Sequence, residues 1–152
     1  MPQAFALLQA GRADQAIAQL KRLLQKQPND AATVHAMGAV YLHLGEFAQA
    51  EFFLARAVKL WPGVPAYHNN LANALYSLNR LEEAVGHYRT ALERDPSYFP
   101  AYIGLAPTLT RLDRWEEAAA ASFKAIELRP DLAIPYDNAA LALTRLGEIE
   151  EA

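Results

Sequence analysis

The sequence predicts an all-α solenoid of antiparallel helix pairs, with about four and a half units of 34 residues each. Three observations support this prediction. Prolines recur every 34 residues, at Pro28, Pro62, Pro96 and Pro130. Each interval carries two apolar stripes of helical period, the first at unit positions 4, 7, 8 and 11 and the second at 20, 24, 27 and 28. Alanine supplies 31 of the 152 residues, and many alanines fall where two helices would approach closely.

With the recurring proline set as position 32, the chain reads as one continuous array over residues 1–152. It comprises a partial unit 1–30, full units 31–64, 65–98 and 99–132, and a partial unit 133–152. Position 20 holds only alanine and position 8 only small residues: Ala16, Ala50, Ala84, Ala118 and Ala152 in the first column, and Ala4, Gly38, Ala72, Ala106 and Ala140 in the second. Small residues allow close helix packing, so these columns predict the contact between the two helices of a unit.

Each helix follows from local signals in this register. The first helix of each unit is expected at 2–10, 31–44, 65–78, 99–112 and 133–146, and the second at 14–27, 47–60, 81–94 and 115–128. Position 15 separates them with residue types that accept a left-handed backbone: Gly11, Gly45, Asn79, Asp113 and Gly147. The position-32 prolines end the second helices, and acidic pairs such as Glu82–Glu83 suit a helix start.

This pattern resembles the tetratricopeptide repeat, and the resemblance extends over the whole chain. Its clearest copy is residues 65–98. The resemblance implies a right-handed solenoid whose first helices line a concave groove, chiefly with positions 2, 5, 6, 9, 12 and 13. The spacing of these positions also places them away from the stripe that packs within each unit. We therefore expect their side chains to be accessible to solvent.

The groove positions supply the candidate partner-binding residues. Asn69, Asn70 and Asn73 present three amides within about one helical turn, which either hold a peptide backbone or form a neutral polar surface. Arg111 and Arg145 share position 13, where they either grip a carboxylate or backbone carbonyl or complement helix C-termini. The complete candidate set is His35, His43, Asn69, Asn70, Asn73, Tyr76, Ser77, Arg111, Asn138 and Arg145.

Two branches of the resembling family can be compared with the groove. Asparagine at position 6, as in Asn70 and Asn138, is similar to the asparagine ladder of O-GlcNAc-transferase-type superhelices, and Ala36 and Gly104 interrupt it. The family's clamp for chaperone C-termini requires basic residues at positions 2 and 6 of one unit. In each possible register of this chain, neither position holds a basic residue, which disfavours an Hsp70 or Hsp90 co-chaperone.

Composition and the lack of known motifs argue against a catalytic, metal or cofactor site in this chain. It has no cysteine, no phosphate-binding glycine loop, no zinc-protease motif and no nucleophile elbow, so we expect no catalytic residues, no metal and no cofactor. His35 and His43 lie eight residues apart, about 12 Å along a helix, which is too far to share an ion. The net charge of −3 and the lack of a long apolar run favour neither nucleic-acid nor membrane partners, and the lack of a basic leader makes cytoplasmic localisation the default expectation.

The sequence thus predicts a non-catalytic protein–protein interaction scaffold that binds an extended peptide or a partner helix in its concave groove. One alternative is a substrate-recruiting arm of a larger enzyme such as a glycosyltransferase, which predicts a catalytic domain after Ala152. Another is self-association, because the last unit lacks most of its second helix and leaves apolar surface open. The partial units at both ends favour a segment cut from a longer chain.

Overall fold

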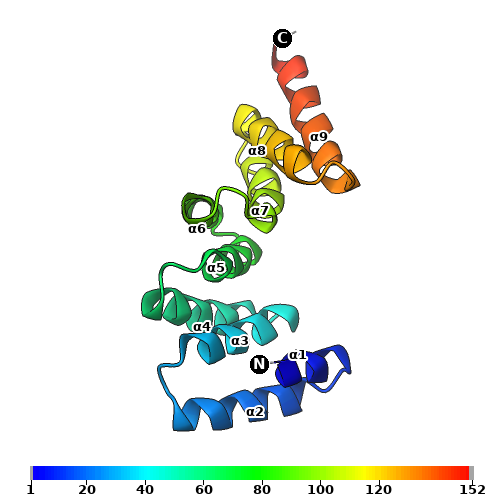
Figure 1. The fold of residues 1–152 in the computed structure, drawn as a ribbon. Coiled ribbons are helices and arrows are strands. Elements are labelled where there is room, and N and C mark those ends of the chain that lie inside the picture. The colour runs from blue at the N-terminus through cyan, green and yellow to red at the C-terminus, as the bar shows by residue number, and fades with distance from the viewer. Residues whose placement is uncertain (1, 151–152) are drawn as a thin grey trace.

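A computed structural model of the protein describes residues 2–150, with side chains from 6 to 149, and it confirms the all-helical array. Figure 1 shows the helices stacked in antiparallel pairs, with the two termini at opposite ends of an elongated molecule. The first helices of the units, called the A helices below, are α1 (Pro2–Gln9), α3 (Ala31–His43), α5 (Pro65–Ser77), α7 (Phe99–Thr110) and α9 (Ala133–Glu150). The second helices, called the B helices, are α2 (Ala13–Lys26), α4 (Phe47–Leu60), α6 (Leu81–Arg94) and α8 (Trp115–Leu128).

The small-residue columns form the helix–helix contacts that the sequence predicts, except at Ala140 of position 8, which is exposed because no B helix follows α9 among the described residues. The position-20 alanines are completely buried at Ala16, Ala50, Ala84 and Ala118. At position 8 of α3, a Cβ added to Gly38 would lie 2.6 Å from Cγ of Leu54 on α4. The two helices therefore pack so closely here that only glycine, which has no side chain, fits. Ala152 lies outside the described residues, and the side chain of Ala4 lies outside the described side chains.

The turns between A and B helices confirm four of the five expected left-handed residues. Gly11, Gly45, Asn79 and Asp113 have φ values of 71°, 77°, 61° and 56°. The fifth expectation is wrong, because α9 continues through Gly147 to Glu150 instead of ending at residue 146. A glycine inside a helix costs only about 1 kcal/mol. In the other units the B helix that follows the turn packs against its A helix, whereas no B helix follows α9 among the described residues.

The helix contacts reveal which side of the array is inner. Each A helix contacts the next A helix along the chain, from α1 to α9. Among residues 2–150, by contrast, no B helix comes into similar contact with another B helix. The stack is therefore closer together along the A helices, which form its inner, concave side, and more open along the B helices on its outer side. None of the helices in this part of the chain has the length and apolar character needed to cross a bilayer.

Candidate partner-binding surface

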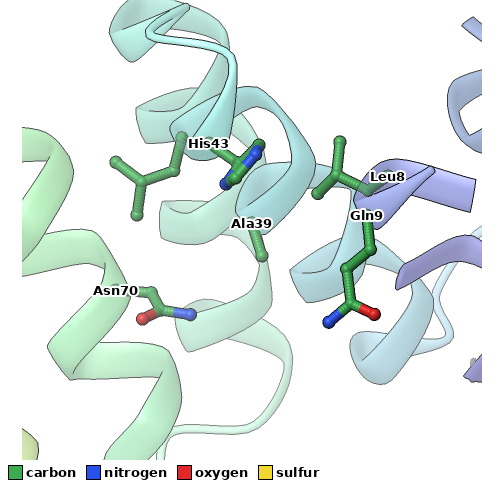
Figure 2. Close-up of a pocket in the computed structure, with 6 residues that line it drawn as sticks. Leu8, Gln9, Ala39, His43 and Asn70 are labelled. Atoms are coloured by element: carbon green, nitrogen blue, oxygen red, sulfur yellow. The ribbon is translucent and has the colours of Figure 1, made fainter. Parts of the chain in front are cut away.

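A hollow of about 400 Å³ opens on the inner side near the N-terminal end of the array. Its lining comes from three successive A helices: Leu8 and Gln9 of α1, Ala39, Leu42 and His43 of α3, and Asn70 of α5. Figure 2 shows the side-chain amides of Gln9 and Asn70 on opposite sides of Ala39. The hollow thus combines apolar walls with two neutral groups that both donate and accept hydrogen bonds.

The amide of Asn70 is fixed by a neighbouring histidine. Nδ2 of Asn70 donates to Nε2 of His35 over 2.8 Å, so the imidazole is neutral and carries its proton on Nδ1. Burial lowers the pKa of His35 to about 4, which keeps the ring neutral near pH 7. The ring also stacks on Tyr67 of α5, with 4.4 Å between the centroids. His35 therefore joins α3 to α5 and orients Asn70, rather than standing open in the groove.

Asn69 does not have the solvent access that we expected from the pattern. Its side chain is only 5% exposed, and Ala36, another groove position, is fully buried. Nδ2 of Asn69 donates to Oδ1 of Asn70 over 3.3 Å, while its own Oδ1 is buried without a partner among the described atoms. Position 5 lies where successive A helices meet. His35, at the same position of the preceding unit, likewise contacts Tyr67 of the next A helix. The close contact of the A helices is the reason that the expectation is wrong.

Asn73 is held from beneath by a tyrosine of the B helix. The hydroxyl of Tyr88 donates to Oδ1 of Asn73 over 2.6 Å, and burial raises the pKa of Tyr88, so the hydroxyl keeps its proton. A Cβ on Gly104 would lie 2.4 Å from the Tyr88 ring. Gly104 therefore provides the space for this ring. The asparagine ladder is interrupted at residue 104 because a tyrosine from the preceding unit fills the place of a side chain there.

At the C-terminal ends of α5 and α7, an arginine lies across an aromatic ring. The guanidinium of Arg111 is 4.9 Å from the centroid of Tyr76 and donates to Oδ1 of Asn79 over 2.5 Å. Ser77 beside them is exposed, and its hydroxyl donates to the carbonyl of Asn73 within the same helix. These contacts bring Tyr76 and Arg111 together in one place on the rim of the inner side.

The remaining candidates occupy separate places. His43 is exposed at the hollow, while Asn138 and Arg145 lie on α9 at the far end of the array. Arg145 pairs with Glu148 of its own helix at 2.8 Å, so Arg111 and Arg145 have different environments although they share a column. The ten predicted residues thus lie in five places. His43 and Asn70 line the hollow, His35 and Asn69 lie where α3 and α5 meet, and Asn73 lies over Tyr88. Tyr76, Ser77 and Arg111 lie on the α5–α7 rim, and Asn138 and Arg145 lie on α9.

Sequence reasoning missed three residues that shape this surface. Gln9 occupies position 13 of the first, partial unit, so the same column that indicates Arg111 also points to Gln9. The sequence pattern indicates only a turn at Asn79, although its side chain also accepts a hydrogen bond from Arg111. Tyr88 belongs to a B helix, and only the missing side chain at Gly104 indicates that it reaches the inner side.

A histidine pair lies between α5 and α6, away from the hollow. Nδ1 of His68 is 3.2 Å from Nδ1 of His87, and Nε2 of His68 is 3.0 Å from the carbonyl oxygen of Pro62. His68 is 5% exposed, as its core-facing position predicts. Over the described part of the chain, no three histidine, cysteine or acidic side chains are grouped so that they could hold a metal ion.

Comparison with known proteins gives a consistent picture of the fold. Family models described as tetratricopeptide repeat match residues 7–74 and 65–98. The TPR repeat-containing thioredoxin TTL4 of Arabidopsis thaliana is 40% identical over 74 residues, which is 49% of this chain and 11% of that protein. This chain therefore spans only about a tenth of that curated relative.

Two solved structures are similar over most of the chain. The crystal structure of MamA protein superposes with a TM-score of 0.88 at 23% identity, covering 97% of this chain and 81% of that one. The O-GlcNAc transferase of Thermobaculum terrenum, as its K341M mutant, superposes with a TM-score of 0.75 at 27% identity. That match covers 82% of this chain and 24% of the transferase chain.

Proposed function

Because this chain belongs to the tetratricopeptide-repeat family, we propose that it is a non-catalytic scaffold that binds a protein partner on its inner side. The observation that carries the proposal is the hollow formed by α1, α3 and α5. Its volume of about 400 Å³ is within the range of sites that accept a ligand group, and a large side chain fits within it. Leu8, Ala39 and Leu42 give it apolar walls, so the side chain that fits is apolar.

The two amides beside the hollow favour an extended peptide over a partner helix. A helix satisfies its own backbone N–H and C=O groups, except at its ends, and has none to offer to Gln9 or Asn70. An extended peptide presents free N–H and C=O groups along its length, and each amide can both donate to and accept from them. Asn70 enters such a contact already oriented by His35, which lowers the entropy lost on binding.

The proposal can be tested with peptides selected on the chain itself. A random linear peptide library is displayed on phage and selected on the immobilised 152-residue protein, and the enriched peptides are synthesised for calorimetry. Ala39→Gln places a long polar side chain in the hollow, and we expect it to weaken binding by about tenfold or more. Ala55→Gln makes the same exchange on the exposed outer face of α4 and should leave binding unchanged. Failure to select any peptide, or equal affinities for both variants, would contradict the proposal.

A second candidate function is the substrate-recruiting arm of a larger enzyme such as a glycosyltransferase. The similarity to the Thermobaculum terrenum transferase at 27% identity, together with Asn70 and Asn138 at position 6, favours this alternative. In that case the inner side presents peptide substrates to a catalytic domain on the same polypeptide. Reading the gene beyond the codon for Ala152 distinguishes the candidates, because only the second requires such a domain.

A further inference from the structure

Arg111 differs from most of the other arginines with defined contacts in having no acidic partner. Arginine side chains elsewhere in the array form ion pairs with carboxylates, at Arg80, Arg89, Arg114, Arg129 and Arg145. Arg111 instead contacts two neutral groups, the ring of Tyr76 at 4.9 Å and Oδ1 of Asn79 at 2.5 Å. Over residues 2–150, no carboxylate approaches it within ion-pair distance.

The acidic residues close in sequence to Asn79 or to Arg111 do not supply this partner. Glu82, just after the Asn79 turn, pairs with Arg114 at 3.1 Å, and Glu83 pairs with Arg80 at 2.6 Å. Asp113 follows Arg111 by two residues, but no ion pair in the described part of the chain joins the two. The positive charge of Arg111 therefore stays uncompensated on the rim of the inner side.

The two neutral contacts also fix the orientation of the guanidinium group. Tyr76 restrains its plane, and the bond to Asn79 uses one of its terminal nitrogens. An arginine has five N–H groups in a planar fork, so several remain available for a further acceptor. A carboxylate is the acceptor whose two oxygens match that fork, and a fork held in place loses less entropy when it binds.

We propose that Arg111, held by Tyr76 and Asn79, is a receptor for an aspartate or glutamate side chain of the peptide partner. This inference rests on the proposed function and adds the sign and place of one recognised charge. The hollow is centred on α3, and Arg111 lies at the ends of α5 and α7. With A helices about 9 Å apart and an extended chain advancing about 3.3 Å per residue, the acidic residue lies about three to six residues from the apolar residue in the hollow.

The decisive experiment compares peptide selections on four versions of the chain. The wild-type chain is expected to enrich peptides with one aspartate or glutamate at that spacing from an apolar residue. Arg111→Gln should lose the acidic preference, and Arg111→Glu should exchange it for lysine or arginine at the same place. Arg94→Gln is the matched control, because Arg94 is an exposed arginine in the last turn of α6, a B helix on the outer side. Circular dichroism of each variant checks that it is folded.

Synthetic peptides then measure the size of the effect. Replacing the selected glutamate by glutamine should weaken binding to the wild-type chain about five- to tenfold, and should have no effect on binding to Arg111→Gln. Amidation of the peptide C-terminus should leave the affinity unchanged, since the proposed ligand is a side chain. A preference confined to a free C-terminal carboxylate would overturn the assignment to a side chain.

The test separates failure of this inference from failure of the proposed function. Peptides that bind at the hollow, as shown by their loss on Ala39→Gln, without acidic enrichment would overturn the role of Arg111 alone. An unchanged acidic preference on Arg111→Gln would do the same. If no peptide is selected on the wild-type chain, the proposed function itself fails.

Discussion

Replacing Gly104 by alanine tests the account of how α6 and α7 pack together. The added Cβ would lie 2.4 Å from Cε1 and Cζ of Tyr88 and 2.5 Å from its hydroxyl oxygen. Non-bonded carbon atoms prefer separations of about 3.5–4.0 Å, so the ring or the helix must move by about 1 Å. Tyr88 is 1% exposed, so its ring has no open space to enter, and its hydroxyl is held by the hydrogen bond to Asn73.

The expected change in the free energy of unfolding combines two destabilising effects and one stabilising effect. Overpacking of this kind costs about 1–3 kcal/mol, and losing the bond between Tyr88 and Asn73 costs about 1 kcal/mol more. Alanine favours a helix over glycine by about 1 kcal/mol, which offsets part of this cost. We expect the free energy of unfolding of Gly104→Ala to fall by about 1–3 kcal/mol.

Gly86 supplies a matched control, because the same exchange there should raise the free energy of unfolding instead of lowering it. It lies inside α6 on an exposed face, and an added Cβ there meets no atom within 4 Å. Gly86→Ala should therefore raise the free energy of unfolding by about 0.5–1 kcal/mol. Urea denaturation followed by circular dichroism measures both variants, with the slopes compared because repeat arrays can lose cooperativity. If Gly104→Ala is as stable as Gly86→Ala, the proposed packing of Tyr88 beneath α7 is wrong.

Three further predictions concern other parts of the array. Tyr88→Phe should lower the free energy of unfolding by about 1 kcal/mol in urea denaturation, since Oδ1 of Asn73 loses its donor; an unchanged value would argue against that bond. His35 has a folded pKa of about 4 against 6.5 when unfolded, so the stability it contributes is fully present above pH 6.5 and is lost as the pH falls toward 4. His35→Gln should then lose less stability over that interval, and parallel pH profiles would refute the assignment. The side chains of Tyr136 and Leu143 on α9 are 46% and 49% exposed, so we expect concentration-dependent self-association that Leu143→Glu abolishes; a monomeric wild-type chain in analytical ultracentrifugation would contradict this.

The sequence predicted the fold well because its signals repeat. Each prediction for a helix or turn rests on the same position in several units, so the φ values at Asn79 and Asp113 confirm what the neighbouring glycines already indicated. The misplaced end of α9 has a physical cause. A glycine permits a turn but does not impose one, and residues 147–150 have no B helix to fold back against among the described residues.

The candidate surface was less predictable, because column rules assign a face to a side chain but not its contacts. Position 5 belongs to the groove by spacing, yet Asn69 is buried where the A helices meet. The orientation of Asn73 depends on Tyr88, fifteen residues later, and that of Arg111 depends on Asn79 in the preceding unit. Contacts between units depend on the distance and angle between helices, which a single sequence pattern does not contain.

Chemical-shift mapping of a bound peptide tests the central claim, that the partner binds on the inner side, most directly. The ¹⁵N-labelled chain is titrated with the tightest peptide from the selection, and amide shifts are followed by residue. We predict the largest changes at Gln9, around Ala39 and His43 on α3, and around Asn70 on α5, with little change on the outer faces of α4 and α6. Changes concentrated on those B helices, with the A helices unaffected, would contradict the account.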